Sequence, residues 1–267
     1  MLRIYGISKT FNPQTVNQKK ALDQVSLTLD SGDFATIVGS NGAGKSTLFH
    51  AITGEFFVDE GQIILGDEDI TFKREHRRSK VIGHLFQNPL QGTAPGMTIE
   101  ENMSLAFMKA SKENYNALSR MHQNEKKKFR EKLELLGMGL EDRLKQPVGL
   151  LSGGQRQALT LLMATMVTPR LLLLDEHTAA LDPATAQKVL DLTRKVIQEN
   201  HITCLMVTHD MHQALSLGNR TLMMDSGKII YDVNGAERDQ LTVEDLLMKF
   251  KENAGTALET DRILLTK

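Results

Sequence analysis

The stretch Gly39-Ser40-Asn41-Gly42-Ala43-Gly44-Lys45-Ser46 decides the fold, because it fits the phosphate-loop pattern G-x-x-x-x-G-K-[ST] at every required position. The apolar run 34–38 before it predicts a buried strand, and the segment 45–52 after it has the apolar spacing of a helix. Glycines lack a Cβ, so successive backbone N–H groups can face phosphate oxygens at the helix N-terminus. Lys45 would bring its charge to the β and γ phosphates, and the Ser46 hydroxyl would bind magnesium. This order of strand, loop and helix argues against an incidental glycine-rich turn.

Length, composition and charge narrow the class of protein. The chain has 267 residues, of which 40% are hydrophobic, enough to bury a core of its own. A formal net charge of -1 gives no overall attraction to nucleic acid or anionic lipid. The single cysteine, Cys204, excludes an intramolecular disulfide and a cysteine-based zinc site, which is typical of a reducing compartment. Residues 1–6 lack a signal-peptide core, and no apolar run approaches the ~20 residues that span a bilayer, so we expect membrane association only through a partner.

The N-terminal third predicts further strands. Segments 2–7 and 22–29 alternate apolar with polar residues, as in the half-exposed strands of an antiparallel layer. Phe11 adjoins the polar loop 12–20, where its ring could stack on adenine or pack in the ordinary way. The basic run 73–78 is interpreted as a solvated face. Two more strands are predicted, at 62–65 and 81–86, and Gln87 follows the second directly.

The middle of the chain has a helical pattern. Thr98 to Glu101 has the sequence pattern of a capping box. The charged segment 111–137 carries apolar residues at helical spacing, with 126–128 on its solvent-exposed face. The stretch Leu151-Ser152-Gly153-Gly154-Gln155 then opens a helix over 156–167. Ser152 can cap that helix, and the two glycines expose backbone N–H groups at its start. The sequence therefore predicts a second anion-binding surface here.

Two apolar runs in the last third end in polar side chains. Residues 171–174 read as a central parallel strand followed by Asp175-Glu176, and residues 202–207 as a buried strand followed by Thr208-His209-Asp210. The carboxyl ends of such strands commonly reach an active site. Asp182-Pro183 provides an N-cap and a first-turn proline for a helix over 184–198. A hairpin at 220–233 and a helix at 242–250 complete the predicted elements, while 255–267 gives no clear signal.

With these motifs in this order, the chain resembles the ATP-binding subunit of an ABC transporter from about residue 2 to about residue 250. Many NTPases share the phosphate loop and the strand ending in Asp175, whereas 151–155 upstream of that strand is specific to the family. The resemblance implies an α/β fold, in which a P-loop NTPase core with a mixed sheet carries an antiparallel β layer and an inserted α-helical subdomain. A single ABC ATPase domain is expected over 1–267. Its core and β layer would occupy about 1–94 and 168–240, the helical signature subdomain about 95–167, and a C-terminal helix and tail about 241–267.

The resemblance also implies a role for each motif residue. Ser46 and Asp175 would hold Mg²⁺, and Gln87 would contact both the metal and the attacking water. Glu176 would polarise that water, and His209 would contact the γ-phosphate. The catalytic residues would thus be Glu176, His209 and Gln87. The residues expected to bind ATP are Phe11, Gly39, Ser40, Asn41, Gly42, Ala43, Gly44, Lys45, Ser46, Thr47, Ser152, Gly153, Gly154, Gln155 and Asp182.

In such a family, the signature closes on ATP held by a second copy of the chain, and Asp182 lies in a loop that crosses between subunits. ATP binding would close this homodimer and hydrolysis would loosen it. The other implied partners are a transmembrane permease, contacting the surface near 87–98, and an extracytoplasmic substrate-binding protein; nucleic acid is not expected. Within 87–98, Gln91 to Gly96 fits a movable connector or a plain surface loop. The chain would lie at the cytoplasmic face of the plasma membrane. The amino-acid sequence of 175–183 resembles that of an importer group linked to amino acids such as tryptophan.

One position departs from the family pattern, and two other functions compete. His177-Thr178 stands where the family commonly has Pro-Thr. The histidine either adjusts Glu176 or fills space, and we favour the second because most imidazoles near acids are structural. A soluble ABC ATPase acting on ribosomes or DNA is the alternative function, although such relatives usually carry two ATPase units or a long coiled-coil insertion. A GTP switch is opposed by the signature and the acid pair.

Overall fold

The computed structural model describes residues 1–88, 90–110 and 123–253, and these form two compact units. The first unit contains residues 1–78 and the described part of 201–267, and the second contains the described part of 79–200. The helical segment predicted at 111–137 begins outside the described residues, and so does the tail after residue 253. The predicted helical subdomain at 95–167 belongs to the second unit, which also includes 79–94 and 168–200, so the predicted division of the chain stays a prediction.

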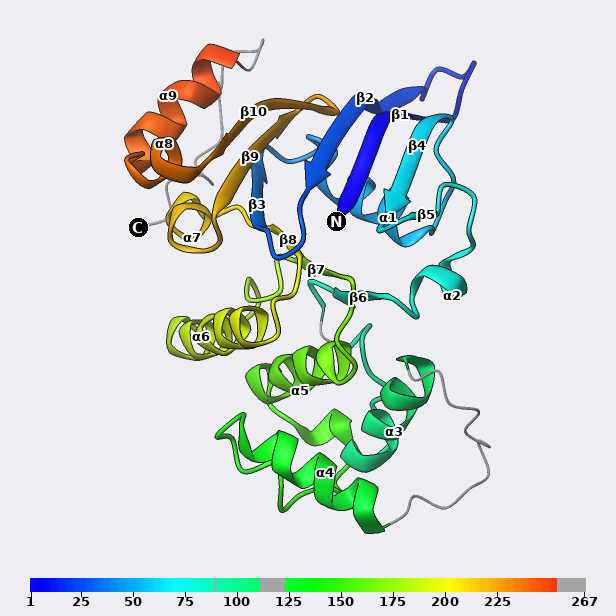
Figure 1. Cartoon of the computed structure of the whole chain (residues 1–267), viewed down its shortest axis with the longest axis vertical. Coiled ribbons are helices and arrows are strands. Elements are labelled where there is room, and N and C mark those ends of the chain that lie inside the picture. The colour runs from blue at the N-terminus through cyan, green and yellow to red at the C-terminus, as the bar shows by residue number, and fades with distance from the viewer. Residues whose placement is uncertain (89, 111–122, 254–267) are drawn as a thin grey trace. The chain divides into compact units, whose positions relative to one another are not determined.

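The first unit contains the predicted antiparallel layer (Figure 1). Its strand order is β2-β1-β4-β5, with the bounds β1 Leu2–Phe11, β2 Lys19–Leu29, β4 Glu60–Leu65 and β5 Glu68–Asp69. Ile4 lies opposite Leu27 on one side and opposite Ile63 on the other, and all three side chains are buried. Because directly opposed residues share a face, this register collects the apolar side chains on one side of the sheet. Strands β1 and β2 are longer than predicted because bulged pairing continues to Phe11 and Lys19.

A second, mixed sheet of the first unit carries the phosphate loop. Its strands β3 Phe34–Gly39, β8 Cys204–Val207, β9 Arg220–Asp225 and β10 Lys228–Asn234 are ordered β10-β9-β3-β8. Strands β9, β3 and β8 are parallel, while β10 pairs with β9 in the predicted hairpin. All six residues of β3 are buried, as expected of a central strand. The helices of this unit are α1 Lys45–Thr53, α2 Glu75–Arg78, α7 Met211–Ser216, α8 Gly235–Asp239 and α9 Val243–Asn253.

The interpretation of 73–78 as a solvated face is wrong for Arg78. Its side chain is 1% exposed and donates hydrogen bonds of 2.7–2.9 Å to four backbone carbonyls, those of Lys73, Ala51, Ile52 and Thr71. Two of these carbonyls belong to the last turn of α1, where no intrahelical partner remains. Burial lowers the pKa of Arg78 to about 10, which still leaves the guanidinium charged. Arg78 therefore closes the C-terminal end of the helix that follows the phosphate loop.

Within its described residues, the second unit pairs two short parallel strands and packs four helices and one 3-10 turn. Strands β6 Ile82–Leu85 and β7 Leu171–Asp175 run in parallel, and β7 is buried up to its last residue. The helical elements are α3 Ile99–Ala110, α4 Gln123–Glu134, η1 Val148–Leu150, α5 Gly153–Thr165 and α6 Pro183–Glu199. The capping box at Thr98 is confirmed, because its hydroxyl accepts from the Glu101 N–H at 3.3 Å while the Glu101 carboxylate accepts from the Thr98 N–H at 2.7 Å.

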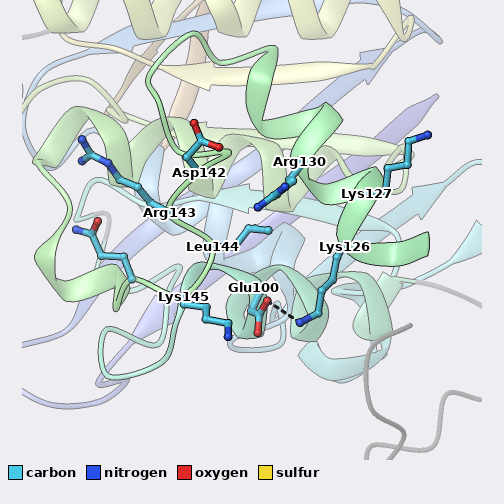
Figure 2. Close-up of a pocket in the computed structure, with 9 residues that line it drawn as sticks. Glu100, Lys126, Lys127, Arg130, Asp142, Arg143, Leu144 and Lys145 are labelled. Carbon is cyan, nitrogen blue, oxygen red and sulfur yellow. Dashed lines mark ion pairs between the residues drawn. The ribbon is translucent and has the colours of Figure 1, made fainter. Parts of the chain in front are cut away.

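A separate pocket of about 690 Å³ lies in the second unit (Figure 2). It is lined by side chains of α3 and α4 and of the segment 142–146, and none of the residues predicted to bind nucleotide is among them. In Figure 2, Lys126 of α4 reaches Glu100 of α3, with 3.3 Å between the charged atoms. Lys127 and Lys128 are exposed, as predicted for the solvent-exposed face of this helix. Lys126 instead links two helices through a partly exposed ion pair, which stabilises the unit only modestly.

Candidate active site

The phosphate loop joins β3 to α1 and approaches neighbouring backbone too closely for other residues. Gly44, with φ 104°, occupies the N-cap position of α1, and a Cβ there would lie 2.7 Å from the carbonyl oxygen of Ala21. A Cβ on Gly39 would lie 2.2 Å from the carbonyl oxygen of Met224. No side chain caps α1, whereas α5, α6 and α7 are each capped by a side-chain oxygen. The start of α1 is therefore suited to receive an external acceptor such as phosphate.

Lys45 is folded over this loop. Its side chain is 7% exposed, and Nζ donates to the carbonyl oxygens of Gly39 at 2.6 Å and Ser40 at 3.0 Å. These two hydrogen bonds orient the ammonium group along the loop. Ser46 is exposed one position further along. The predicted phosphate-binding residues thus lie together in one loop at the start of α1, and their chemistry fits a triphosphate.

His209 lies at the same sheet edge as the loop. Strands β3 and β8 are parallel with Ile37 opposite Val207, so Gly39, the last residue of β3, and His209, two residues after β8, are at matching positions. The turn carrying His209 is held by a hydrogen bond of 3.1 Å from the Asp210 N–H to the Thr208 hydroxyl. Local pairing therefore brings His209 to the edge on which the phosphate loop begins.

Phe11 has packing contacts of its own. Its ring lies edge-on to Phe56, with 5.3 Å between centroids, and Lys9 Nζ is 5.9 Å from its centre. These contacts support the packing role, while the adenine-stacking role stays a prediction. Sequence reasoning missed Lys19, whose Nζ lies 3.6 Å from the position of a Cβ on Gly42. No motif marks Lys19, because its approach to the loop depends on the β1 to β2 pairing.

The acidic residues form the second group, and they belong to the second unit. Leu85 of β6 lies opposite Leu174 of β7, which places Gln87 and Glu176 at matching positions two residues further on. Gln87 Nε2 donates to Glu176 Oε2 at 3.0 Å. Asp175 is the last residue of β7. The structure therefore brings Gln87, Asp175 and Glu176 together at the carboxyl end of this strand pair, although 89 positions separate Gln87 from Glu176.

Glu176 has a strained backbone. Its φ is 42°, in the left-handed region that residues with a Cβ rarely adopt. Such a conformation costs ~1–3 kcal/mol and persists only where surrounding contacts hold it. The next turn is closed by a hydrogen bond of 2.9 Å from the Ala179 N–H to the Glu176 carbonyl oxygen. This strain coincides with the residue predicted to orient water.

His177 is buried directly after Glu176. It is 2% exposed, and its Nε2 lies 3.2 Å from the Thr193 hydroxyl of α6. Burial lowers the pKa of His177 to about 4, so its ring is neutral near pH 7. A buried neutral ring is not an acid or base near pH 7, while both interpretations of His177, adjusting Glu176 or filling space, stay predictions.

The signature stretch begins α5 and packs against the start of α6. Ser152 is the predicted N-cap, with its hydroxyl accepting from the Gln155 N–H at 3.3 Å and its own N–H donating to Gln155 Oε1 at 3.2 Å. A Cβ on Gly154 would lie 2.0 Å from Thr185 Cγ2, so only glycine allows this approach. Asp182 caps α6 by accepting a hydrogen bond from the Thr185 N–H at 3.0 Å. The pKa of the Asp182 carboxyl is lowered, chiefly by hydrogen bonding to Thr185. Ser152 to Gln155 and Asp182 are therefore neighbours.

The predicted site residues belong to both units. Phe11, residues 39–47 and His209 lie in the first unit, whereas Gln87, 152–155 and the acids lie in the second. Among the described residues, no group of three His, Cys, Asp or Glu side chains is arranged to hold a metal ion. The predicted Mg²⁺ ligands are instead a hydroxyl, an amide and one carboxylate, a set that needs phosphate oxygens to complete it. Likewise, no helix in the described parts of the chain has the length and apolarity to cross a bilayer.

Comparison with known proteins relates this geometry to a family. The family described as ABC transporter matches residues 22–179. A tyrosine transport ATP-binding protein of Clostridioides difficile is 41% identical over 251 residues, covering 94% of this chain and 99% of that protein. A methionine import ATP-binding protein of Corynebacterium glutamicum is 36% identical over 84% of this chain, which spans 60% of that relative.

Solved structures agree with the sequence relatives. A dimeric ATP-binding cassette in a post-hydrolysis state, bound to ADP and Pi, is similar with a TM-score of 0.74 and 27% identity. The similarity covers 88% of this chain and 98% of that one. It confirms the predicted α/β P-loop NTPase fold with its mixed sheet and antiparallel layer. The chain belongs to the ABC transporter family, as an ATP-binding and ATP-hydrolysing subunit.

Proposed function

We propose that this ATPase powers the import of an amino acid, with aromatic amino acids such as tyrosine or tryptophan as the favoured substrates. The observation that carries this proposal is the 41% identity to the tyrosine transport ATP-binding protein, because it extends over nearly the full length of both chains. The methionine import relative supports the broader class of amino-acid uptake. Selectivity in such a system belongs to the membrane partner, since this chain contributes nucleotide chemistry.

The working assembly in this proposal is a homodimer bound to a transmembrane permease at the cytoplasmic face of the membrane, supplied by an extracytoplasmic substrate-binding protein. The dimeric state of a related cassette supports the homodimer. Each copy would hold ATP on its phosphate loop and cover its partner's ATP with Ser152 to Gln155. ATP contacts made only in the closed state would then favour closure, and hydrolysis would release it.

The position of each residue supports its proposed catalytic role. Lys45 and the N–H groups at the start of α1 bind the phosphates, and His209 contacts the γ-phosphate from the same sheet edge. Glu176, oriented by Gln87, accepts a hydrogen bond from the attacking water. Ser46, Asp175 and Gln87 would hold Mg²⁺, which neutralises phosphate charge when bound.

Uptake measurements test this function. A strain lacking this chain should lose most of its energy-dependent uptake of labelled tyrosine or tryptophan, and the wild-type chain, but not Lys45→Ala, should restore it. Affinity purification of the tagged chain from detergent-solubilised membranes should recover a multi-spanning membrane protein. Intact uptake of every amino acid tested, or recovery of ribosomes or DNA in place of a membrane protein, would contradict the proposal.

A further inference from the structure

The ring of His177 is held in one tautomer by the groups around it. Thr193 Oγ1 lies 2.7 Å from the carbonyl oxygen of Val189, one turn earlier in α6. A carbonyl only accepts, so this contact uses the single hydroxyl proton of Thr193. The hydroxyl must therefore accept from His177, and the ring hydrogen must reside on Nε2, 3.2 Å away. Nδ1 is then unprotonated, and it is buried without a hydrogen-bond partner in the described parts of the chain.

The hydrogen bond between His177 and Thr193 connects α6 to the backbone next to the strained residue of the candidate site. His177 immediately follows Glu176, whose φ of 42° needs support from its surroundings. The other end of the same loop is also fixed to α6, because Asp182 caps that helix. Residues 176–182 are therefore attached to α6 at both ends, and the His177 to Thr193 bond is the attachment nearer Glu176.

We infer that His177 is a positioning residue for hydrolysis, which holds the Glu176 carboxylate in its reactive orientation through its hydrogen bond to Thr193. This inference rests on the proposed role of Glu176. The ring itself exchanges no proton with substrate, since it is enclosed and faces a helix hydroxyl. The His177 to Thr193 bond acts through the backbone of residue 176 and thereby preserves the 3.0 Å bond between Gln87 and Glu176. A residue that only filled space would require the ring's volume and not its donor atom.

Shape-conserving substitutions separate the donor from the volume. His177→Phe keeps an aromatic ring without the donor, and Thr193→Val keeps the side-chain shape without the acceptor. Each should lower kcat at saturating ATP about 10-fold while the Kd for a fluorescent ATP analogue changes less than about 2-fold. Thr193→Ser keeps the hydroxyl and should retain kcat within about 2-fold of wild type. Glu199→Gln, an exposed substitution on the same helix, is the control and should retain the wild-type kcat.

The double variant tests whether both residues act through one bond. His177→Phe combined with Thr193→Val should lower kcat about 10-fold, as each single change does, whereas independent effects would multiply to about 100-fold. In a Glu176→Gln background, His177→Phe should leave the residual rate unchanged, because there is no longer a carboxylate to position. Thermal unfolding of each variant identifies losses caused by misfolding. If His177→Phe does not fold, the Thr193→Val and Thr193→Ser pair still decides the outcome.

Two results would overturn this inference. One is wild-type kcat in folded His177→Phe and Thr193→Val proteins; the other is a multiplicative loss in the double variant. Failure of the proposed role of Glu176 has a different signature, since Glu176→Gln would then keep wild-type turnover whatever the His177 variants do. Loss of turnover in Glu176→Gln together with normal turnover in both positioning variants would reject the positioning role alone.

Discussion

Glu176 is the residue at which backbone and side-chain constraints coincide. Its left-handed φ of 42° fixes where its side chain leaves the backbone, and the Gln87 amide fixes one carboxylate oxygen at 3.0 Å. Groups oriented before the reaction need no reorganisation when charge develops in the transition state. The strain at this position is therefore consistent with a group prepared to orient water.

Replacing Glu176 with Gln should separate binding from hydrolysis. An amide of equal size can still receive the Gln87 hydrogen bond but is a poor acceptor for a proton of the attacking water, so turnover should fall ~10²–10⁴-fold. ATP affinity should stay near that of the wild type, and an ATP-bound dimer should accumulate in size-exclusion chromatography. Lys45→Ala is the comparison, because it should weaken ATP binding itself. Undiminished ATPase activity in Glu176→Gln would remove Glu176 from the mechanism.

At the scale of elements, helix α1 is stabilised by different chemistry at its two ends. Its N-terminus follows the glycine loop and has no side-chain cap, which leaves that end to the phosphates. Its C-terminus is closed by Arg78, which donates to the carbonyls of Ala51 and Ile52. A Cβ on Gly54, the C-cap, would lie 2.6 Å from the guanidinium Nε. One end is therefore kept for the ligand while the other is satisfied by the protein.

Arg78→Lys should destabilise the protein although it conserves the charge. A lysine ammonium cannot reach four carbonyls arranged around a planar guanidinium, so buried acceptors would lose their donors, at a cost of ~2–4 kcal/mol. Arg77→Lys, an exposed change next to it, should alter stability by less than ~0.5 kcal/mol. Urea unfolding followed by circular dichroism measures both. Equal unfolding midpoints for the two variants would show that the Arg78 network contributes no stability.

At the scale of the whole molecule, the predicted residues are divided between two units, with the phosphate loop in one and the signature in the other. In the proposed homodimer, the loop of one copy and the signature of its partner complete each ATP site. A self-contained site would instead use the loop and signature of a single chain. The two arrangements differ in how a loop mutation and a signature mutation must be distributed between the two chains to leave one ATP site intact.

Mixed dimers carrying Lys45→Ala and Ser152→Arg distinguish these arrangements. If sites are shared, placing the two changes on different chains leaves one intact site and about half of the wild-type ATPase activity, whereas placing both on one chain leaves none. Self-contained sites predict the reverse pattern. Differently tagged chains purified in tandem provide both dimers for a phosphate-release assay. The Arg side chain acts by blocking the glycine-lined start of α5, where a Cβ on Gly154 would already have no room.

Several features of this protein depend only on residues that are neighbours along the chain. The phosphate loop, the caps at Ser152 and Asp182 and the hairpin at 220–233 were all predictable, because glycine conformations, capping bonds and tight turns are decided within a few positions. The order of these motifs then indicated the family and its fold.

Which distant residues meet depends instead on how the chain folds. In the sequence, Arg78 is one of several cations expected to be solvated, but the fold buries it against α1. His177 meets Thr193 only because the loop after β7 turns back onto α6. Gln87 likewise reaches Glu176 through the pairing of two strands far apart in the chain. Such contacts depend on burial and chain reversal, which local spacing does not encode, because the same side chain is solvated or enclosed according to what packs over it.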